Sequence, residues 1–249
     1  MLNVPAYLER IRYAGPAAPT PDTLRALHRA HMFAVPFENL DIHLRRKIVC
    51  DEARFLHKIV IERRGGFCYE LNGAFAALLR ALGFQVTLLS ARVARPDCSD
   101  GPEFDHLTLR VDLEEPWLSD VGFGDGFLEP LRLKPDEEQP QIGRSYRVTV
   151  GEGVFRVEVR TNAKWNREYS FTPQPRQLSD FAAMCHYHQT SPDSSFTRSR
   201  TCSRATPDGR VTLSNGKLIE THNGSRAEKA LTDEEWSACL RDLFGVVLP

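Results

Sequence analysis

The stretch that most constrains the fold is Arg63–Gly83, RRGGFCYELNGAFAALLRALG. Two glycines stand just before Cys68, and Gly83 stands where a helix in this stretch would end. The apolar residues that follow the cysteine recur at i, i+4, i+7, i+8 and i+11, the spacing of one buried helix face: Leu71, Phe75, Leu78, Leu79 and Leu82. The pattern predicts a buried helix whose first turn carries Cys68.

This position gives the Cys68 thiol a possible chemical role. The first turn of a helix lies at the positive end of the helix dipole, which favours a thiolate and lowers the pKa of a thiol. A free cysteine more often behaves as a small buried hydrophobe. The residue pattern alone therefore leaves both the nucleophile and the core interpretation open.

The chain before Gly83 reads as a largely helical unit. Thr20 is a plausible N-cap with proline at the first helical position after it, and Pro36 ends that helix. Phe37 and Glu38 then follow in a segment that we expect to be irregular. Phe37 is either core filler or a wall of an aromatic-binding pocket.

After Gly83 the apolar period changes from that of a helix to two, which predicts strands. In the segment from His106 to Leu113 the four apolar residues point into a core, so His106 points to the opposite face. Short turns without intervening helices imply an antiparallel sheet or small barrel. The proline-containing segment Phe171–Phe181 is the best candidate for a linker.

The last part of the chain predicts a small α/β unit. Asn215-Gly216 marks a hairpin turn, and the capping box from Thr232 to Glu235 opens a final helix. The three units are then a helical domain at residues 1–83, a β domain at 84–180, and an α/β unit at 181–249 that includes the interdomain segment.

Composition excludes several classes of partner. The 249 residues carry 32 Lys plus Arg against 33 Asp plus Glu, so no global field attracts nucleic acid or an anionic membrane. No signal peptide and no stretch of membrane-spanning length is apparent. Six cysteines scattered through a large chain indicate a reducing cytoplasm rather than a disulfide framework. The oligomeric state stays open.

A cysteine nucleophile needs a base to take its proton and a third group to orient that base. His106 lies 38 residues after Cys68, and Asp120 lies 14 residues further on, which fits a helix start followed by two neighbouring strands. A strand histidine is more often structural, and an aspartate before Gly-Phe-Gly is more often a turn former. Cys68, His106 and Asp120 are thus the candidate catalytic set.

Other motifs carry weaker chemical signals. Cys185, His186 and His188 are close in sequence, but no second ligand cluster accompanies them, so we expect no metal. The G-x-G-x-G run from Gly122 to Gly126 lacks the helix of a dinucleotide fingerprint, although its backbone N–H groups could meet an anion. A basic stretch could contact phosphates or be a solvated face: Arg198, Arg200, Arg204 and Arg210.

The segment RGGFCYELN around Cys68 resembles the nucleophile signature of the arylamine N-acetyltransferases. Four further segments follow in that family's order: VPFENLDIHL, FDHLTLRV, WLSDVGFGDGF and SPDSSFTRS. Arg46, where glycine is expected, and the Cys185-His186 pair depart from the family pattern, and the chain is somewhat shorter than many members. These departures concern the acceptor pocket and the coenzyme contacts.

The resemblance implies a multi-domain α+β fold with an N-terminal helical bundle, a central antiparallel β-barrel, a C-terminal α/β lid and a papain-like Cys-His-Asp core. It also implies acetyl transfer from acetyl-CoA to arylamines, arylhydroxylamines or arylhydrazines through acetyl-Cys68, with both partners being small molecules. On resemblance alone, Phe37, Phe123 and Phe196 surround the acceptor, while Gly122 and Gly124 lie near coenzyme A. A cysteine hydrolase with the same triad, or a non-catalytic module that binds coenzyme A or an aromatic ligand, remains the alternative.

Overall fold

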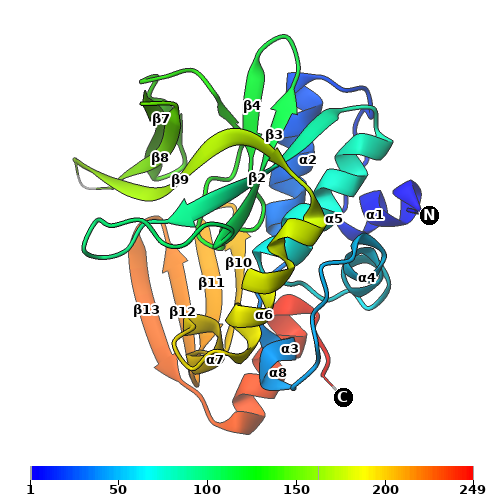
Figure 1. The fold of residues 1–249 in the computed structure, drawn as a ribbon. Helices are drawn as coiled ribbons and strands as arrows, with labels where there is room; N and C mark the ends of the chain where they lie inside the picture. Colours follow the sequence, from blue (N-terminus) through cyan, green and yellow to red (C-terminus); the bar gives the residue numbers. More distant parts are fainter. Residues whose placement is uncertain (1, 162, 249) are drawn as a thin grey trace.

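The computed structural model describes residues 2–161 and 163–248. The N-terminal part is helical, as predicted, and α5 lies near the centre of the molecule (Figure 1). Its elements are α1 (Val4–Arg10), α2 (Pro21–Ala34), β1 (Phe37–Glu38), α3 (Leu40–His43), α4 (Glu52–Leu56), the π-helical turn η1 (His57–Ile61) and α5 (Cys68–Ala81).

The predicted helix boundaries are confirmed where a local signal specifies them. The Thr20 hydroxyl accepts a hydrogen bond from the Thr23 N–H, and Pro21 opens α2. Helix α5 begins at Cys68 and is followed by Gly83, whose φ of +90° suits a residue without a Cβ. Every residue of α5 from Cys68 to Leu79 is buried, so this helix forms the inner layer of the fold.

The central sheet has eight antiparallel strands in the order β5-β4-β3-β2-β9-β8-β7-β6. It curls so that β5 comes back beside β7, giving the barrel-like form that the short turns predict. Its strands are β2 (Gln85–Val93), β3 (His106–Asp112), β4 (Pro116–Ser119), β5 (Leu131–Arg132), β6 (Gln139–Gln141), β7 (Arg144–Gly151), β8 (Val154–Thr161) and β9 (Lys164–Arg176).

The linker prediction for Phe171–Phe181 is wrong. Strand β9 continues to Arg176, and the 3-10 turn η2 (Leu178–Phe181) follows almost at once. Beyond Phe171 the strand pairs with β2 alone, because its pairing with β8 ends at that residue. A strand with one neighbour tolerates prolines, which lack the N–H that a second neighbour would need.

The C-terminal part contains a five-stranded antiparallel sheet that lies below the barrel in Figure 1, with α8 packed beneath it. The hairpin at Asn215-Gly216 and the capping box at Thr232 are both confirmed. Its elements are α6 (Ala182–Thr190), α7 (Ser195–Arg198), β10 (Thr201–Thr206), β11 (Gly209–Ser214), β12 (Lys217–His222), β13 (Ser225–Ala230) and α8 (Asp233–Phe244).

The segment at Phe37 and Glu38 is not irregular, contrary to the prediction. It forms β1, which pairs with β10 and so adds an N-terminal strand to the C-terminal sheet. The largest buried cluster likewise joins side chains from all three predicted units, including Leu24, Leu107 and Ala205. The division at residues 83 and 180 stays a prediction. Among the helices of the described residues, none has the length and apolar character to cross a membrane.

Candidate active site

The start of α5 is held by a tight approach of two chain segments. A Cβ on Gly65 would lie 1.8 Å from the Pro36 carbonyl oxygen, so only glycine fits beside β1. The Phe67 N–H donates to the Glu70 carboxylate at 3.1 Å, which caps the first turn of the helix. Cys68 is consequently fixed as the first residue of α5, with 3% of its surface exposed.

His106 and Asp120 come together because their strands are neighbours. His106 opens β3, Asp120 directly follows β4, and these two strands pair with each other. The His106 Nε2 and the Asp120 Oδ2 lie 2.6 Å apart, and both side chains are buried. Cys68 and His106 are also close enough for each side chain to shift the pKa of the other, so the three predicted catalytic residues lie in one buried group.

Burial and charge act in opposite directions on these groups. Burial alone lowers the His106 pKa, but the Asp120 carboxylate and the Cys68 sulfur raise it to about 10. Burial raises the pKa of the Cys68 thiol, against the opposing effects of His106 and the Leu107 N–H. The expectation of a lowered thiol pKa is therefore wrong, because desolvation outweighs the opposing effects of His106 and the Leu107 N–H. A thiolate here depends on a protonated His106 beside it.

Sequence reasoning missed the residue that joins α5 to Asp120. Asn72 Nδ2 donates to Asp120 Oδ1 at 2.8 Å and to the Leu107 carbonyl at 2.6 Å, while its Oδ1 accepts from the Val121 N–H at 2.9 Å. Asn72 lies one turn after Cys68 on the same helix face. The spacing of four residues between Cys68 and Asn72 in the RGGFCYELN segment was the sequence signal that could have indicated this role.

The glycine at position 122 has a packing role. A Cβ there would lie 2.8 Å from the Cys68 Cα and 2.7 Å from the Asn72 Nδ2. The Gly122 N–H also donates to Asp120 Oδ1 at 3.0 Å. Gly124 differs, because its φ of +86° sets the turn, and a Cβ there would lie 3.7 Å from the Phe37 ring. The loop after Asp120 therefore packs directly on the nucleophile.

The three predicted pocket aromatics lie around the same residues. The Phe123 ring is edge-on to His106 at 5.2 Å between centroids. Phe196 lies 6.2 Å from Phe37 and 5.7 Å from Phe67, the residue before Cys68. Tyr169, which the sequence did not single out, lies 5.2 Å from His106. Apolar rings thus surround the nucleophile and its base.

A buried ionic cluster supports the loop that precedes Cys68. Lys58 Nζ lies 2.8 Å from both Asp41 and Glu70, and Arg64 Nη2 lies 2.8 Å from Glu38. Burial raises the pKa of Glu70 to about 7, with Lys58 opposing the rise. The cluster ties β1, α3 and η1 to the first turn of α5.

The cysteine and histidine motif does not form a metal site, and two arginines of the basic stretch have partners in other parts of the fold. Cys185 and His188 are buried, whereas His186 is exposed, and His188 Nε2 lies 3.2 Å from Asp105 Oδ1. Within the described residues, no group of three or more His, Cys, Asp or Glu side chains is placed to hold a metal ion. Of the basic stretch, Arg204 donates to a carbonyl of α8 and Arg210 pairs with Asp125.

Known proteins are similar to this chain in sequence and in fold. The profile of a family described as N-acetyltransferase matches residues 20–249. An arylamine N-acetyltransferase of Escherichia coli is 36% identical over 245 residues, which cover 96% of this chain and 87% of that protein. The Mycobacterium tuberculosis arylamine N-acetyltransferase structure has a TM-score of 0.92 at 33% identity, covering 98% of this chain and 93% of that one.

A Mycobacterium marinum arylamine N-acetyltransferase solved in complex with CoA gives a TM-score of 0.91 at 31% identity, covering 98% of this chain and 93% of that one. Similarity of this extent, in sequence and in fold together, covers nearly the whole chain. This protein therefore belongs to the arylamine N-acetyltransferase family.

Proposed function

We propose that this protein transfers an acetyl group from acetyl-CoA to arylamines and arylhydroxylamines through an acetyl-Cys68 intermediate. The family supports the overall reaction, and relatives are named arylamine N-acetyltransferase and N-hydroxyarylamine O-acetyltransferase. The observation that carries the chemistry is the buried group of Cys68, His106 and Asp120, in which the His106 Nε2 lies 2.6 Å from the Asp120 Oδ2.

In the first half-reaction, the Cys68 thiolate attacks the thioester carbonyl carbon while His106 is an imidazolium. The bond from that carbon to the coenzyme sulfur breaks, and His106 gives its proton to the departing thiolate. The backbone N–H of Cys68, at the start of α5, is one donor to the developing oxyanion. The products are acetyl-Cys68, free coenzyme A and neutral His106.

In the second half-reaction, an aromatic amine attacks the acetyl-cysteine and His106 accepts the amine proton. The bond from the acetyl carbon to Cys68 then breaks, which restores the thiolate and imidazolium pair. An arylamine suits this scheme because it is largely unprotonated near neutral pH. We place Phe37, Phe123 and Phe196 around the acceptor ring, since they lie next to the nucleophile and its base.

Asp120 is the orienting group in this mechanism. Its carboxylate accepts from His106 on one oxygen, and the other accepts from Asn72 and Gly122. Asn72 is a positioning residue, because it connects the carboxylate to the helix that carries Cys68. The pair holds the imidazole with Nε2 toward Asp120, which leaves Nδ1 for the thiol.

Initial-rate kinetics test the proposal against its alternatives. Double-reciprocal plots against an aromatic amine, at several fixed acetyl-CoA concentrations, should give parallel lines, and the amine should accelerate release of coenzyme A. A hydrolase would discharge its acyl group at a rate indifferent to the amine. A binding module would release no coenzyme A at all. Intersecting lines would contradict the covalent mechanism while leaving acetyl transfer in place.

We propose that the protein acts in the cytoplasm. The six cysteines are all free thiols, and three of them are buried: Cys68, Cys185 and Cys202. Free thiols of this kind persist in a reducing environment.

A further inference from the structure

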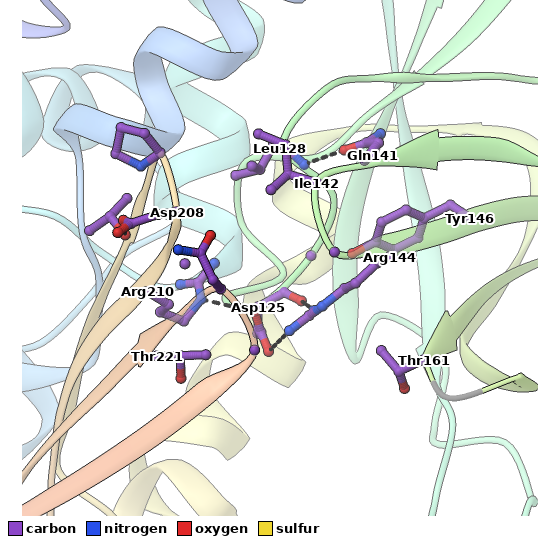
Figure 2. A pocket seen from close by; sticks show the side chains of 17 residues that line it. Asp125, Leu128, Gln141, Ile142, Arg144, Tyr146, Thr161, Asp208, Arg210 and Thr221 are labelled. Carbon is purple, nitrogen blue, oxygen red and sulfur yellow. Dashed lines mark hydrogen bonds and ion pairs between the residues drawn. The ribbon is translucent and has the colours of Figure 1, made fainter.

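A cavity of about 550 Å³ lies between the barrel and the C-terminal sheet (Figure 2). One wall is the loop from Asp125 to Leu128 with the turn between β6 and β7. The opposite wall is formed by two turns of the C-terminal sheet, at residues 206–210 and 221–224. Gly143 and Gly224 lie one on each wall.

Two arginines from opposite walls share one carboxylate in this cavity. Arg144 Nη2 lies 2.7 Å from Asp125 Oδ2, and Arg210 Nε lies 2.9 Å from Asp125 Oδ1. Figure 2 shows the three side chains converging. The Arg210 side chain is only 13% exposed, whereas that of Asp125 is 59% exposed. The cations are thus set into the walls, and the carboxylate is the accessible member.

The other acidic residues near this cavity do not compete with Asp125 for the two arginines. Burial raises the pKa of Glu168 to about 8, with Arg144 opposing the rise, so Glu168 is largely protonated near neutral pH. Asp208, in the cavity lining, lies 3.0 Å from His222 and 3.0 Å from the Thr206 hydroxyl. Two guanidinium groups therefore face one exposed carboxylate.

Arg210 has one donor group that is available to a ligand. Its Nε donates to Asp125 and its Nη1 to the Ser203 hydroxyl, so Nη2 has no hydrogen-bond partner among residues 2–161 and 163–248. An anion with three or more oxygens could take this donor together with those now given to Asp125. Phosphate fits that description, and the planar fork of arginine matches it in bidentate geometry.

One short loop of the chain links the wall of this cavity to the catalytic site. Asp125 lies three residues after Gly122, which packs on the Cys68 Cα, and two residues after Phe123, which contacts His106. An anion that takes Arg144 and Arg210 from Asp125 would therefore act on the loop that packs on the nucleophile. A donor with phosphates at one end and a thioester at the other could reach both places.

We propose that Arg144 and Arg210 form the site that recognises a phosphate of the acyl donor, and that this phosphate replaces the carboxylate of Asp125. The inference rests on the proposed acetyl-CoA chemistry. Asp125 then acts as an internal competitor, occupying the arginines until the donor arrives. Arg144 and Arg210 select donors that carry phosphate, and they do not touch the reacting atoms.

The test compares two acetyl donors in four variants. Acetyl-CoA carries phosphates, and S-acetyl-N-acetylcysteamine is a thioester without them. Arg144→Gln and Arg210→Gln should each raise KM for acetyl-CoA by about 10- to 100-fold, the cost of a charge-assisted hydrogen bond. For the phosphate-free thioester, any change in kcat/KM should be much smaller than the change for acetyl-CoA. Arg147→Gln is the matched control, because Arg147 lies on β7 with similar side-chain exposure but pairs with Glu158 outside the cavity.

For Asp125→Asn we expect KM for acetyl-CoA to change in the opposite direction. Removing the competing carboxylate should lower KM for acetyl-CoA, and it should tighten inhibition by adenosine 3′,5′-bisphosphate, a phosphate probe without a thioester. If the three side chains form only a structural bridge, Asp125→Asn and Arg210→Gln would impair both donors in the same direction. That result, or an unchanged KM in both arginine variants, would overturn the proposal.

Two further measurements distinguish a folding defect, a wrong proposed function and a wrong phosphate site. Where Arg210→Gln lowers the melting temperature, Arg210→Lys keeps the charge and should give an intermediate KM for acetyl-CoA. Wild-type protein that acetylates arylamines from neither donor would refute the proposed function. Wild-type transfer with donor-independent variants would refute only the phosphate site.

Discussion

Asp120 and Asp125 lie five positions apart in the loop that follows β4, and their settings are opposite. Asp120 is 1% exposed and accepts hydrogen bonds from His106, Asn72 and the Gly122 N–H. The side chain of Asp125 is 59% exposed and is shared by two arginines at a cavity wall. One carboxylate is fixed by partners that no solvent or ligand can replace, and the other can exchange its partners.

The physical difference is the cost of leaving a charge without partners. A buried charge that loses one partner costs about 3–5 kcal/mol, so the inner site has one stable arrangement. The Asp125 carboxylate is exposed and can return to water when a ligand takes its arginines, so its release costs less than that of a buried charge. The same short loop can therefore hold the base rigidly at one end and respond to a donor at the other.

The largest expected effect comes from Asp120→Asn at the inner end. The amide fits the space, but it can neither stabilise the imidazolium nor enforce its tautomer, and in serine proteases the equivalent change costs about 10⁴-fold in turnover. The measurement is kcat for an aromatic amine, with a thermal melt to show that the variant is folded. Turnover near that of the wild type would remove Asp120 from the mechanism.

A pair of glycine substitutions compares the two ends of the loop directly. Gly122→Ala should destabilise the protein by about 1–3 kcal/mol, because its Cβ would lie 2.8 Å from the backbone of Cys68. Gly126→Ala is the matched control, since its nearest contact is the Phe123 Cβ at 3.2 Å. Denaturant unfolding of both variants gives the comparison. Equal losses would mean that the inner end is no more tightly packed than the outer end.

The most gradual effect is a dependence of stability on pH. The His106 pKa is raised in the folded state to about 10 from its ordinary 6.5, so the folded protein binds more protons between these values. The stability due to His106 is then fully present below about pH 6.5 and is lost as the pH rises to about 10. Comparing Cys68→Ala with Cys68→Ala/His106→Gln removes the ionisation of the thiol itself. In this background Asp120 still raises the His106 pKa but Cys68 does not, so the window ends at a lower pH than in the wild type.

The free energies of unfolding of these two variants should converge as the pH rises. Chemical denaturation at one-unit steps from pH 6 to 10 measures the difference. A gap that stayed constant, or one that widened with pH, would show that His106 is not held as an imidazolium.

Much of the fold was predictable where short-range signals determine it. The N-cap at Thr20, the helix from Cys68, the Asn215-Gly216 turn and the capping box at Thr232 all depend on neighbours within a few residues. Strand β1 and the end of β9 were missed, because their partners lie far away in sequence. Local residue types at Phe37 and in the proline-containing segment could not reveal those partners.

The candidate site, like the fold, was predictable only in part from the sequence. The family resemblance specified Cys68, His106 and Asp120, and the fold brings them together. The connecting role of Asn72 depends on the position of Asp120 in space, and the raised pKa of the Cys68 thiol depends on burial from several elements. The charge pairing of Asp125 with Arg210 joins residues 85 positions apart, which no local pattern could indicate.

Intact-mass measurement after mixing the protein with acetyl-CoA, without any acceptor, tests the acetyl-cysteine intermediate most directly. We expect a gain of one acetyl group, which peptide mapping places on Cys68, which Cys68→Ala abolishes and which an added arylamine removes. An unmodified wild-type mass under conditions in which arylamine is acetylated, or an acetyl group on another residue that turns over at the rate of catalysis, would contradict the mechanism.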